Sequence, residues 1–196
     1  FGLSSRVDLW VLERTLRFLA EHRDRLPGQR FAINLAPPTV CRAQFPLEVS
    51  RLLAKYGVEA WQLIFEVTEC SSFGSAEQAI QTLRQLQKMG VRIAIDDFGT
   101  GYASYARLKS VDADILKIDG SFIRNIVSNS LDYQIVASIC HLARMKKMLV
   151  VAEYVETEEI HSAVHALGID YVQGYLIGKP VALESLSQAG ASQVDA

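Results

Sequence analysis

Two adjacent aspartates followed by a glycine-rich turn are the residues of this chain best suited to chemistry. Asp96 and Asp97 follow the apolar run 93–95, and residues 98–102 then read Phe-Gly-Thr-Gly-Tyr. Carboxylates at the end of a buried strand repel each other and lose hydration, so the pair is costly unless a cation compensates its charge. The alternative for an isolated pair is an acidic surface turn, and recurrence of the pattern decides between the two.

The pattern of a short apolar run ending on a polar group recurs along the chain. The polar ends are Asn34, Glu66, Asp96, Lys117, Glu153 and Gln173. Intervals of 20 to 36 residues separate successive ends, and each interval can hold a strand, a helix and two short loops. These side chains can bind a metal or a phosphate, which favours a shared site over an accidental acidic turn.

Helical spacing of apolar residues fills most of these intervals. Apolar residues recur at helical spacing between 79 and 89, where Ser75 and Gln78 can form a capping box and Gly90 can end the helix. The same spacing predicts helices over residues 7–21, 131–146 and 158–167, and a weaker pattern covers 46–56. Alternating strands and helices imply a parallel sheet covered by helices, the α/β class.

Two architectures fit this alternation: an open doubly wound sheet and a closed barrel. In a barrel, the carboxyl ends of all strands meet on one face, whereas in an open sheet only the switch point is concave. The even distribution of polar ends over six strands favours a TIM-like (β/α) barrel. Six units are fewer than the usual eight, so we expect a barrel incomplete at the N-terminus, with further strands upstream of Phe1.

Several ordered motifs resemble the EAL domain family, the cyclic-di-GMP phosphodiesterases. They are Ile-Asn-Leu (33–35), Phe-Glu-Val-Thr-Glu (65–69), Asp-Asp-Phe-Gly-Thr-Gly-Tyr (96–102), Leu-Lys-Ile-Asp-Gly-Ser-Phe (116–122), Val-Ala-Glu-Tyr-Val-Glu-Thr (151–157), Gln-Gly-Tyr (173–175) and Gly-Lys-Pro (178–180). The resemblance covers roughly residues 1–185. We therefore expect one EAL-like barrel domain over residues 1–196, with a C-terminal tail over 186–196.

The resemblance implies a set of oxygen ligands for metal ions: Asn34, Glu66, Asp96, Asp97 and Glu153. The four carboxylates among them and one lysine leave a nominal charge of −3, which would repel a phosphodiester. All-oxygen ligation suits Mg²⁺ or Mn²⁺, and two such ions can lower the pKa of a bridging water and neutralise phosphoryl oxygens. In-line attack would then open cyclic di-GMP to the linear dinucleotide pGpG.

The resemblance also implies roles for residues around the metals. Lys117 would hold the attacking water or the phosphate, and Gln173 would lie near the water and the substrate. Glu153 and Lys117 would be catalytic, together with Glu69, which would brace the glycine-rich loop that contains Phe98, Gly99, Thr100 and Gly101. Glu156 matches a family glutamate with a supporting role.

Three departures from the family pattern affect these expectations. The signature glutamate and the arginine after it are absent, because their strand would precede Phe1, and this loss would impair metal binding by this exact chain. Ala36 stands where Ser is common. Tyr154 stands where Gly is common, directly after a predicted ligand, so it either narrows the pocket or points into the outer layer.

Three functions remain open at this stage. The leading one is a metal-dependent phosphodiesterase for cyclic di-GMP in bacterial second-messenger signalling. The alternatives are a receptor or regulatory module that binds the nucleotide without hydrolysis, and a metal-dependent barrel enzyme for another phosphate substrate. The expected partners are cyclic di-GMP, a second copy of the chain in a homodimer, and an upstream sensory or GGDEF-type domain.

Composition is consistent with this reading. The chain has 196 residues, 49% of them hydrophobic, and a net charge of −2, so a sizeable core can form and no nucleic-acid polymer is expected as partner. No apolar run approaches the roughly 20 residues of a membrane helix. The three cysteines lack metal or disulfide spacing. We expect a cytoplasmic domain, either of a free protein or of a membrane-anchored one.

Overall fold

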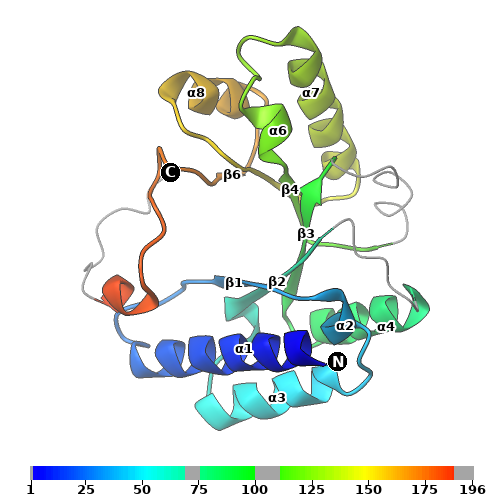
Figure 1. The fold of residues 1–196 in the computed structure, drawn as a ribbon, viewed down its shortest axis with the longest axis vertical. Helices are drawn as coiled ribbons and strands as arrows, with labels where there is room; N and C mark the ends of the chain where they lie inside the picture. Colours follow the sequence, from blue (N-terminus) through cyan, green and yellow to red (C-terminus); the bar gives the residue numbers. More distant parts are fainter. Residues whose placement is uncertain (1, 69–75, 100–110, 188–196) are drawn as a thin grey trace. The chain divides into compact units, whose positions relative to one another are not determined.

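The computed structural model describes residues 2–68, 76–99 and 111–187, which alternate between strands and helices (Figure 1). The strands are β1 (Phe31–Asn34), β2 (Leu63–Thr68), β3 (Arg92–Phe98), β4 (Ile115–Ile118), β5 (Leu149–Ala152) and β6 (Tyr171–Val172). They follow one another in the sheet in sequence order, and the pairings β1–β2, β3–β4, β4–β5 and β5–β6 are parallel. A doubly wound sheet reverses its order at a switch point. The sequential order therefore supports the predicted incomplete barrel.

The helices lie between the strands, as the sequence predicts. They are α1 (Leu3–Glu21), α2 (Pro37–Val40), α3 (Phe45–Tyr56), α4 (Ala76–Lys88), α6 (Gly120–Ile123), α7 (Ser130–Met145) and α8 (Glu158–Ala166), with 3₁₀ turns η1 (Ala60–Gln62) and η2 (Leu183–Ser187). All five helices expected from apolar spacing are confirmed. The single turns α2 and α6 were not predicted, because four residues are too few to show a helical period. Ser75, of the predicted capping box, lies outside the described residues.

The prediction that polar residues end their strands is confirmed for some strands and wrong for others. Asn34 is the last residue of β1, and Glu153 and Gln173 directly follow β5 and β6. By contrast, Glu66 and Lys117 lie inside β2 and β4.

The strands β2, β3 and β4 each continue one or two residues beyond the predicted polar end. Parallel pairing continues there, since Ile118, beyond Lys117, is in register with Ala152 of β5. Backbone pairing, which the side-chain pattern does not reveal, therefore sets the ends of β3 and β4.

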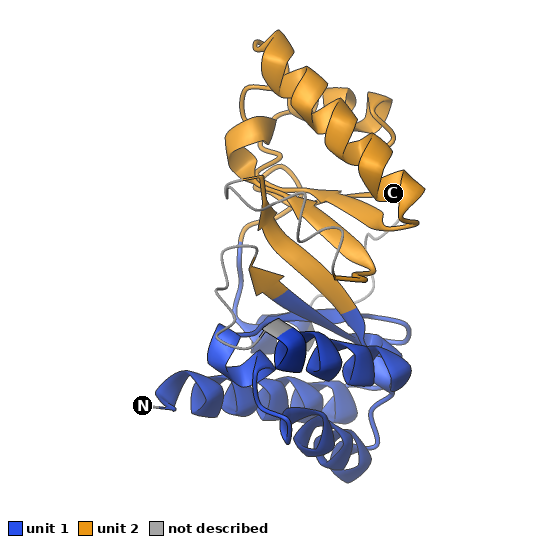
Figure 2. Ribbon diagram, turned by 90° about the vertical axis from the view of Figure 1, so that its right-hand side faces the viewer, with its two compact units in different colours: residues 1–66, 72–92, 180–196 blue, residues 67–71, 93–179 orange. Residues whose placement is uncertain are grey.

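The chain divides into two compact units, shown in two colours in Figure 2. The first comprises residues 1–66, 72–92 and 180–196, and the second comprises 67–71 and 93–179. In the first unit, Leu12 and Leu16 of α1 are fully buried, and the rings of Phe45 and Phe65 lie 5.7 Å apart between centroids. The second unit has its own core, in which Leu116 and Ile118 of β4 pack with apolar residues of α7 and α8.

Two aspartates, one before β4 and one before β6, bind the backbone near the start of the neighbouring strands β3 and β5. The side chain of Asp114 accepts a hydrogen bond from the backbone N–H of Ile93 at 2.8 Å, and Asp170 does the same for Val150 at 2.8 Å. Each aspartate thus pairs a backbone donor at the start of the neighbouring strand. Such bonds fix the alignment of neighbouring strands, and this alignment sets the positions of the polar residues at the other ends of the strands.

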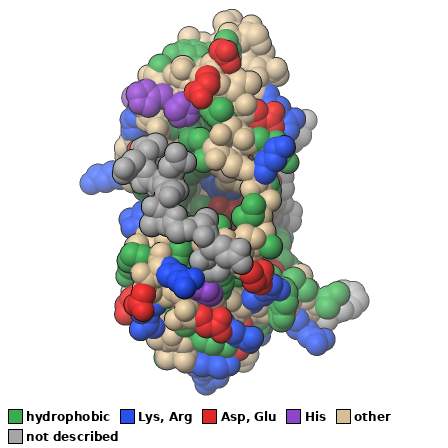
Figure 3. Space-filling view, turned by 90° about the vertical axis from the view of Figure 1, so that its left-hand side faces the viewer, with side chains coloured by type: hydrophobic (Ala, Val, Ile, Leu, Met, Phe, Trp, Pro, Cys, Tyr) green, Lys and Arg blue, Asp and Glu red, His purple; other side chains and the backbone are tan. Residues whose placement is uncertain are grey.

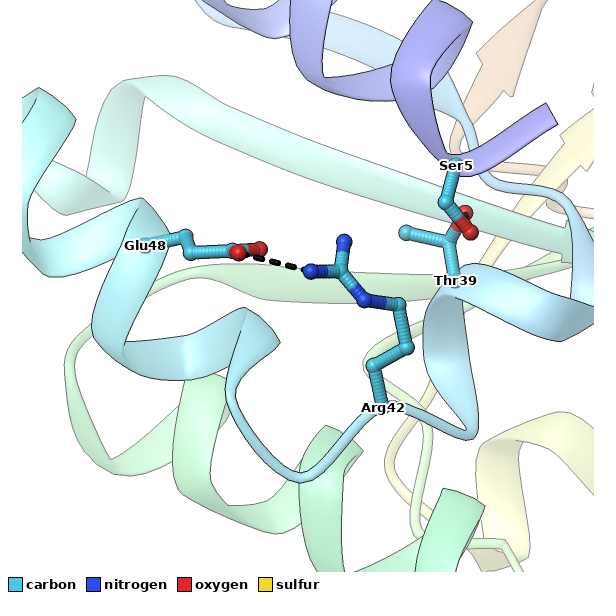
Figure 4. Close-up of polar contacts among 4 residues, drawn as sticks. All are labelled: Ser5, Thr39, Arg42 and Glu48. Atoms are coloured by element: carbon cyan, nitrogen blue, oxygen red, sulfur yellow. Dashed lines mark hydrogen bonds and ion pairs between the residues drawn. The ribbon is translucent and has the colours of Figure 1, made fainter. Parts of the chain in front are cut away.

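A polar network in the first unit ties α1 to the segment that follows β1. Asp8 is 9% exposed and accepts hydrogen bonds from the backbone N–H of Ala36, at 2.9 Å, and from the hydroxyl of Thr39. The hydroxyl of Ser5 lies 3.1 Å from that of Thr39 (Figure 4). Buried polar groups satisfied in this way fix the orientation of the elements that carry them.

The exterior carries charges of both signs. On the face in Figure 3, Lys and Arg side chains are interspersed with Asp and Glu among the described residues, without a continuous patch of either sign. This agrees with the net charge of −2. No helix in the described part of the chain combines the length and apolar character needed to cross a bilayer.

The substitution Asp8→Ala tests the polar network. Removing the carboxylate leaves two donors, the N–H of Ala36 and the hydroxyl of Thr39, without their acceptor. We expect the free energy of unfolding, measured by urea denaturation, to fall by about 2–4 kcal/mol. Asp24→Ala, at an exposed position, serves as control and should change it by less than about 0.5 kcal/mol. Equal effects of the two substitutions would contradict a structural role of the network.

Candidate metal centre

A β-bulge turns the adjacent aspartates of β3 toward one site. Ile95 pairs with Leu116 of β4, but the next pair joins Phe98 to Ile118, so two residues of β3 face one of β4. In a regular strand, adjacent side chains point to opposite faces. The extra residue, Asp97, has a positive φ of 55°, a backbone conformation that Asp adopts more readily than most residues. The bulge therefore lets both carboxylates lie on the same side.

Three carboxylates gather at this point of the second unit. Asp96, Asp97 and Glu153 each offer an oxygen, and these three oxygens lie within 4.8 Å of one another. Lys117, on the strand between them, is 2.8 Å from Asp96 Oδ1 and 2.8 Å from Glu153 Oε1. One ammonium against three carboxylates leaves a formal charge of −2 in a largely buried place. This excess of negative charge is what a bound cation would compensate.

Burial affects the protonation of the cluster. It raises the pKa of Asp97 above its ordinary value, and the neighbouring charges of Asp96 and Asp119 raise it further. Burial likewise raises the pKa of Glu153, against the opposing effect of its hydrogen bond and charge interaction with Lys117. Both shifts mean that the ionised carboxylates are destabilised here without a further positive charge.

The backbone hydrogen bonds switch from one neighbouring segment to another between Glu153 and Val155. The N–H of Glu153 bonds to the carbonyl of Ile118 in β4, whereas the N–H of Val155 bonds to the carbonyl of Gln173 at 3.0 Å. Between them, Tyr154 has a positive φ of 56°. A side chain on Gly174 would place its Cβ 2.2 Å from the carbonyl oxygen of Val155. Only glycine allows this close approach, which fixes the backbone carrying Gln173.

A cavity of about 330 Å³ opens beside the carboxylates, within the second unit. The residues that line it are Asp97, Glu153, Tyr154, Glu156, Gln173, Gly174 and Tyr175. Of the two placements considered for Tyr154, the structure therefore supports the one in the pocket wall. Gln173 and Glu156 line the same cavity, so these two residues of the motifs come together with the carboxylates.

The remaining predicted site residues are placed as follows. Asn34 and Glu66 lie in the first unit, where they are register partners on β1 and β2. Glu66 is 9% exposed, and Asn34 is exposed. Glu69, Thr100 and Gly101 lie outside the described residues.

The predicted loop begins later than expected. Phe98 is the last residue of β3 and is 1% exposed, so it belongs to the core rather than to the loop. Gly99 has a positive φ of 106°, which agrees with the expectation that glycine is needed there. Its Cα faces the ring of Phe122, since a Cβ at position 99 would lie 2.6 Å from that ring.

The first unit has a larger hollow, of about 510 Å³, between α1 and η2. Its charged residues have both signs, and one pair, Arg14 and Glu184, forms an exposed ion pair. Of the described residues, the only group of three metal-ligating side chains is the one in the second unit. Size alone is therefore a poor guide, and the carboxylate cluster marks the candidate site.

Sequence reasoning missed three features of the site. The bulge at Asp96 and Asp97 has no signature in the side-chain pattern, because it exists only relative to the pairing with β4. The need for glycine at 120 and 174 arises from contacts with residues far along the chain, Tyr154 and Val155. Tyr175 was noted as part of a motif, but its position in the cavity wall was not foreseen.

Comparison with known proteins identifies the family. The family model for the EAL domain matches residues 1–180. The chain belongs to the EAL domain family. This membership agrees with the resemblance seen in the sequence motifs.

Two similar proteins illustrate the relationship. Over 180 residues this EAL domain is 74% identical to the cyclic di-GMP phosphodiesterase PdeF of Escherichia coli (strain K12), a match covering 92% of this chain and 24% of PdeF. The solved complex of the PaMucR phosphodiesterase with c-di-GMP is 37% identical, with a TM-score of 0.84, and the match covers 94% of this chain and 75% of PaMucR.

A further solved structure, the EAL domain of Mycobacterium smegmatis DcpA, is 32% identical with a TM-score of 0.88. That match covers 93% of this chain and 82% of the DcpA domain. The comparison confirms the incomplete TIM-like barrel. The chain spans about a quarter of the length of the curated relatives it matches.

Lys117→Ala tests the charge balance of this EAL domain. The substitution leaves Asp96 and Glu153 without their ammonium partner in a buried site. We expect the free energy of unfolding to fall by about 3–5 kcal/mol in EDTA, and millimolar Mg²⁺ to recover part of the loss. Urea denaturation in EDTA and in Mg²⁺ measures the loss and its recovery. Lys88→Ala, at an exposed helix end, is the control. A loss no larger than that of the control would contradict the proposed balance.

The raised pKa values of Asp97 and Glu153 predict opposite pH trends with and without a cation. Without it, these two groups contribute stability below their ordinary pKa of about 4, and that contribution is lost as the pH rises through the raised values. A cation binds the ionised forms, so its stabilising effect should grow over the same rise in pH. Thermal melts with and without Mn²⁺, from about pH 4 to pH 8, measure the difference. If the shift in melting temperature caused by Mn²⁺ were independent of pH, Asp97 and Glu153 would not be the groups that bind the cation.

Proposed function

We propose that this domain is a metal-dependent phosphodiesterase that hydrolyses cyclic di-GMP to the linear dinucleotide pGpG. The observation that carries the proposal is the cluster of Asp96, Asp97 and Glu153 around Lys117 beside a cavity. PdeF, at 74% identity, is named a cyclic di-GMP phosphodiesterase, and PaMucR is described in complex with c-di-GMP. These names support the choice of substrate, and the cluster supports the reaction type.

The donor set fits Mg²⁺ or Mn²⁺. Each donor in the cluster is a carboxylate oxygen, the ligand type that hard divalent cations prefer. Burial disfavours the ionised forms of Asp97 and Glu153, which a further positive charge would stabilise. We propose two ions, held by Asp96, Asp97 and Glu153, with the oxygen donors Asn34 and Glu66 as further ligands. When bound, such ions would acidify a water and neutralise negative charge on the phosphoryl oxygens.

The side chains of this chain supply positioning. Lys117, 6% exposed at its side chain, is fixed by ion pairs to Asp96 and Glu153, so its ammonium can donate to the attacking water or to a phosphate oxygen without first being ordered. Gln173 lines the cavity and presents an amide that can donate to a phosphate oxygen or orient a water. Glu69 remains a proposed brace of the loop at Gly99, Thr100 and Gly101.

The partners and the location of the full-length protein are also proposed. We propose a homodimer, an upstream sensory or GGDEF-type domain, and a cytoplasmic location of the EAL domain. These proposals rest on the family resemblance and not on a feature of the described residues.

The test is hydrolysis of cyclic di-GMP by the full-length protein in Mg²⁺ or Mn²⁺, with products separated by chromatography. The parent should release pGpG, and Asp96→Asn should lower turnover more than about 100-fold, because it removes one ligand charge. Asp24→Asn, the same change at an exposed position outside the site, should leave turnover unchanged. A folded parent that binds the nucleotide without releasing pGpG would favour the receptor alternative instead.

A further inference from the structure

Tyr154 combines an unfavourable backbone with an exposed ring in the wall of the cavity. Its φ of 56° lies in the left-handed region, which a bulky L-residue rarely adopts. The residue directly follows Glu153 of the carboxylate cluster, lines the cavity, and is 44% exposed. Strained backbone of this kind persists where surrounding contacts enforce it, and such places are frequent at functional sites. The exposed ring of Tyr154 is therefore a candidate for contact with a ligand in the cavity.

The ring of Tyr154 is held by two neighbours from one stretch of chain. Gly120 begins α6, and a Cβ on it would lie 2.1 Å from Cδ2 of the tyrosine, so only glycine leaves room for the ring. The guanidinium of Arg124 lies over the ring, 4.1 Å from its centroid. A cation at this distance is attracted to the ring face. The ring is thus fixed in place before any ligand arrives.

The α6 turn that carries these neighbours is itself fixed. Asp119 caps it, accepting a hydrogen bond from the backbone N–H of Ser121 at 2.9 Å. This turn directly follows β4, the strand that carries Lys117. The aromatic wall and the charged centre of the site are therefore attached to the same short segment, which favours a constant spacing between them.

The surroundings of the ring indicate what it can bind. A second exposed tyrosine, Tyr175, lines the same cavity and has the ammonium of Lys179 5.6 Å from its ring centroid. The carboxylate of Glu156 and the amide of Gln173 also line it. Aromatic faces stack on nucleobases of any sequence, and a carboxylate can accept from the N–H groups of a guanine edge. Flat apolar faces beside hydrogen-bonding groups match a purine base.

We propose that Tyr154, seated on Gly120 and backed by Arg124, stacks on a purine base of the nucleotide in this cavity. The proposal rests on the proposed phosphodiesterase function and adds a specificity-determining contact to the same site. The cation on one side of the ring draws electron density toward itself, which favours stacking of an electron-rich purine on the exposed area. A pyrimidine, with a smaller face, gains less from the same contact.

Four variants of the full-length protein separate stacking from other roles; one of them, Arg124→Ala, removes the guanidinium that lies over the ring. Tyr154→Gly removes the ring and relieves the left-handed strain, so its melting temperature should not fall. Tyr154→Phe keeps the aromatic face without the hydroxyl. Tyr171→Ala removes another exposed tyrosine of the same unit, which does not line the cavity, and is the matched control.

The measurement is KM and kcat for cyclic di-GMP, alongside cyclic di-UMP as a pyrimidine probe. Tyr154→Gly should raise KM for cyclic di-GMP roughly 5- to 150-fold, the loss expected for one base–aromatic stack, with a smaller change in kcat. The preference for the purine dinucleotide should shrink in parallel. Tyr154→Phe should restore the low KM for cyclic di-GMP and the purine preference, because it keeps the aromatic face. Tyr171→Ala should behave like the parent, and Arg124→Ala should raise KM by less than Tyr154→Gly.

Other results have distinct meanings. An unchanged KM and purine preference in an active Tyr154→Gly protein overturns the stacking role, as does a fall confined to kcat, which would indicate positioning of Glu153. If Arg124→Ala raises KM as much as Tyr154→Gly does, and equally for both dinucleotides, the stacking role is overturned in favour of a contact between Arg124 and a phosphate. If the parent does not turn over, calorimetric affinities for the two dinucleotides provide the same comparison. A parent that neither binds nor hydrolyses them refutes the proposed function, and the stacking proposal with it.

Discussion

The concentration of carboxylates beside β4 is the constraint on which the rest of the site depends. Asp96 and Asp97 are adjacent in sequence, and a regular strand would direct them to opposite faces. The bulge opposite Lys117 removes that alternation, and Glu153 at the end of the next strand completes the group. Parallel pairing on both sides of β4 thus places the lysine between its two carboxylate partners. The register of the sheet therefore determines which charges meet at the site.

This arrangement is costly for the folded chain, and the cost is local. The buried carboxylates of Asp97 and Glu153, whose pKa values are raised, oppose folding at neutral pH. Two residues of the site, Asp97 and Tyr154, also have left-handed backbone conformations. The surrounding core supplies the compensation, because Phe98, Leu116 and Ile118 are almost completely buried around the same strands. A site held in an unfavourable state without its cation is thereby prepared to bind one, which is the common relation between strain and function.

The sequence was sufficient for the parts of the structure that depend on local pattern. Apolar periodicity located the five longer helices, and their alternation with short apolar runs identified the α/β class. The recurring polar ends indicated a shared site that includes Asp96, Asp97 and Glu153. Lys117 was recognised as part of the same group. These features are visible because a local pattern repeats along the chain, and the carboxyl ends of parallel strands meet on one side of the sheet.

The features that escaped prediction depend on pairing and contact between distant segments. The strands β3 and β4 run past Asp96 and Lys117 because they continue to pair with neighbouring strands, and the bulge exists only relative to β4. Gly120 is required by a tyrosine that lies 34 residues further along the chain. The side-chain pattern of a single segment contains none of this information, whereas the fold imposes all of it.

The most direct test of the account is a crystal structure of the full-length protein grown with Mn²⁺, with anomalous scattering data. The account predicts an anomalous peak bonded to carboxylate oxygens of Asp96, Asp97 and Glu153, with Lys117 still beside the cluster. A well-ordered cluster without such a peak, or Mn²⁺ bound only at other residues, would contradict the claim that this site exists to hold divalent cations.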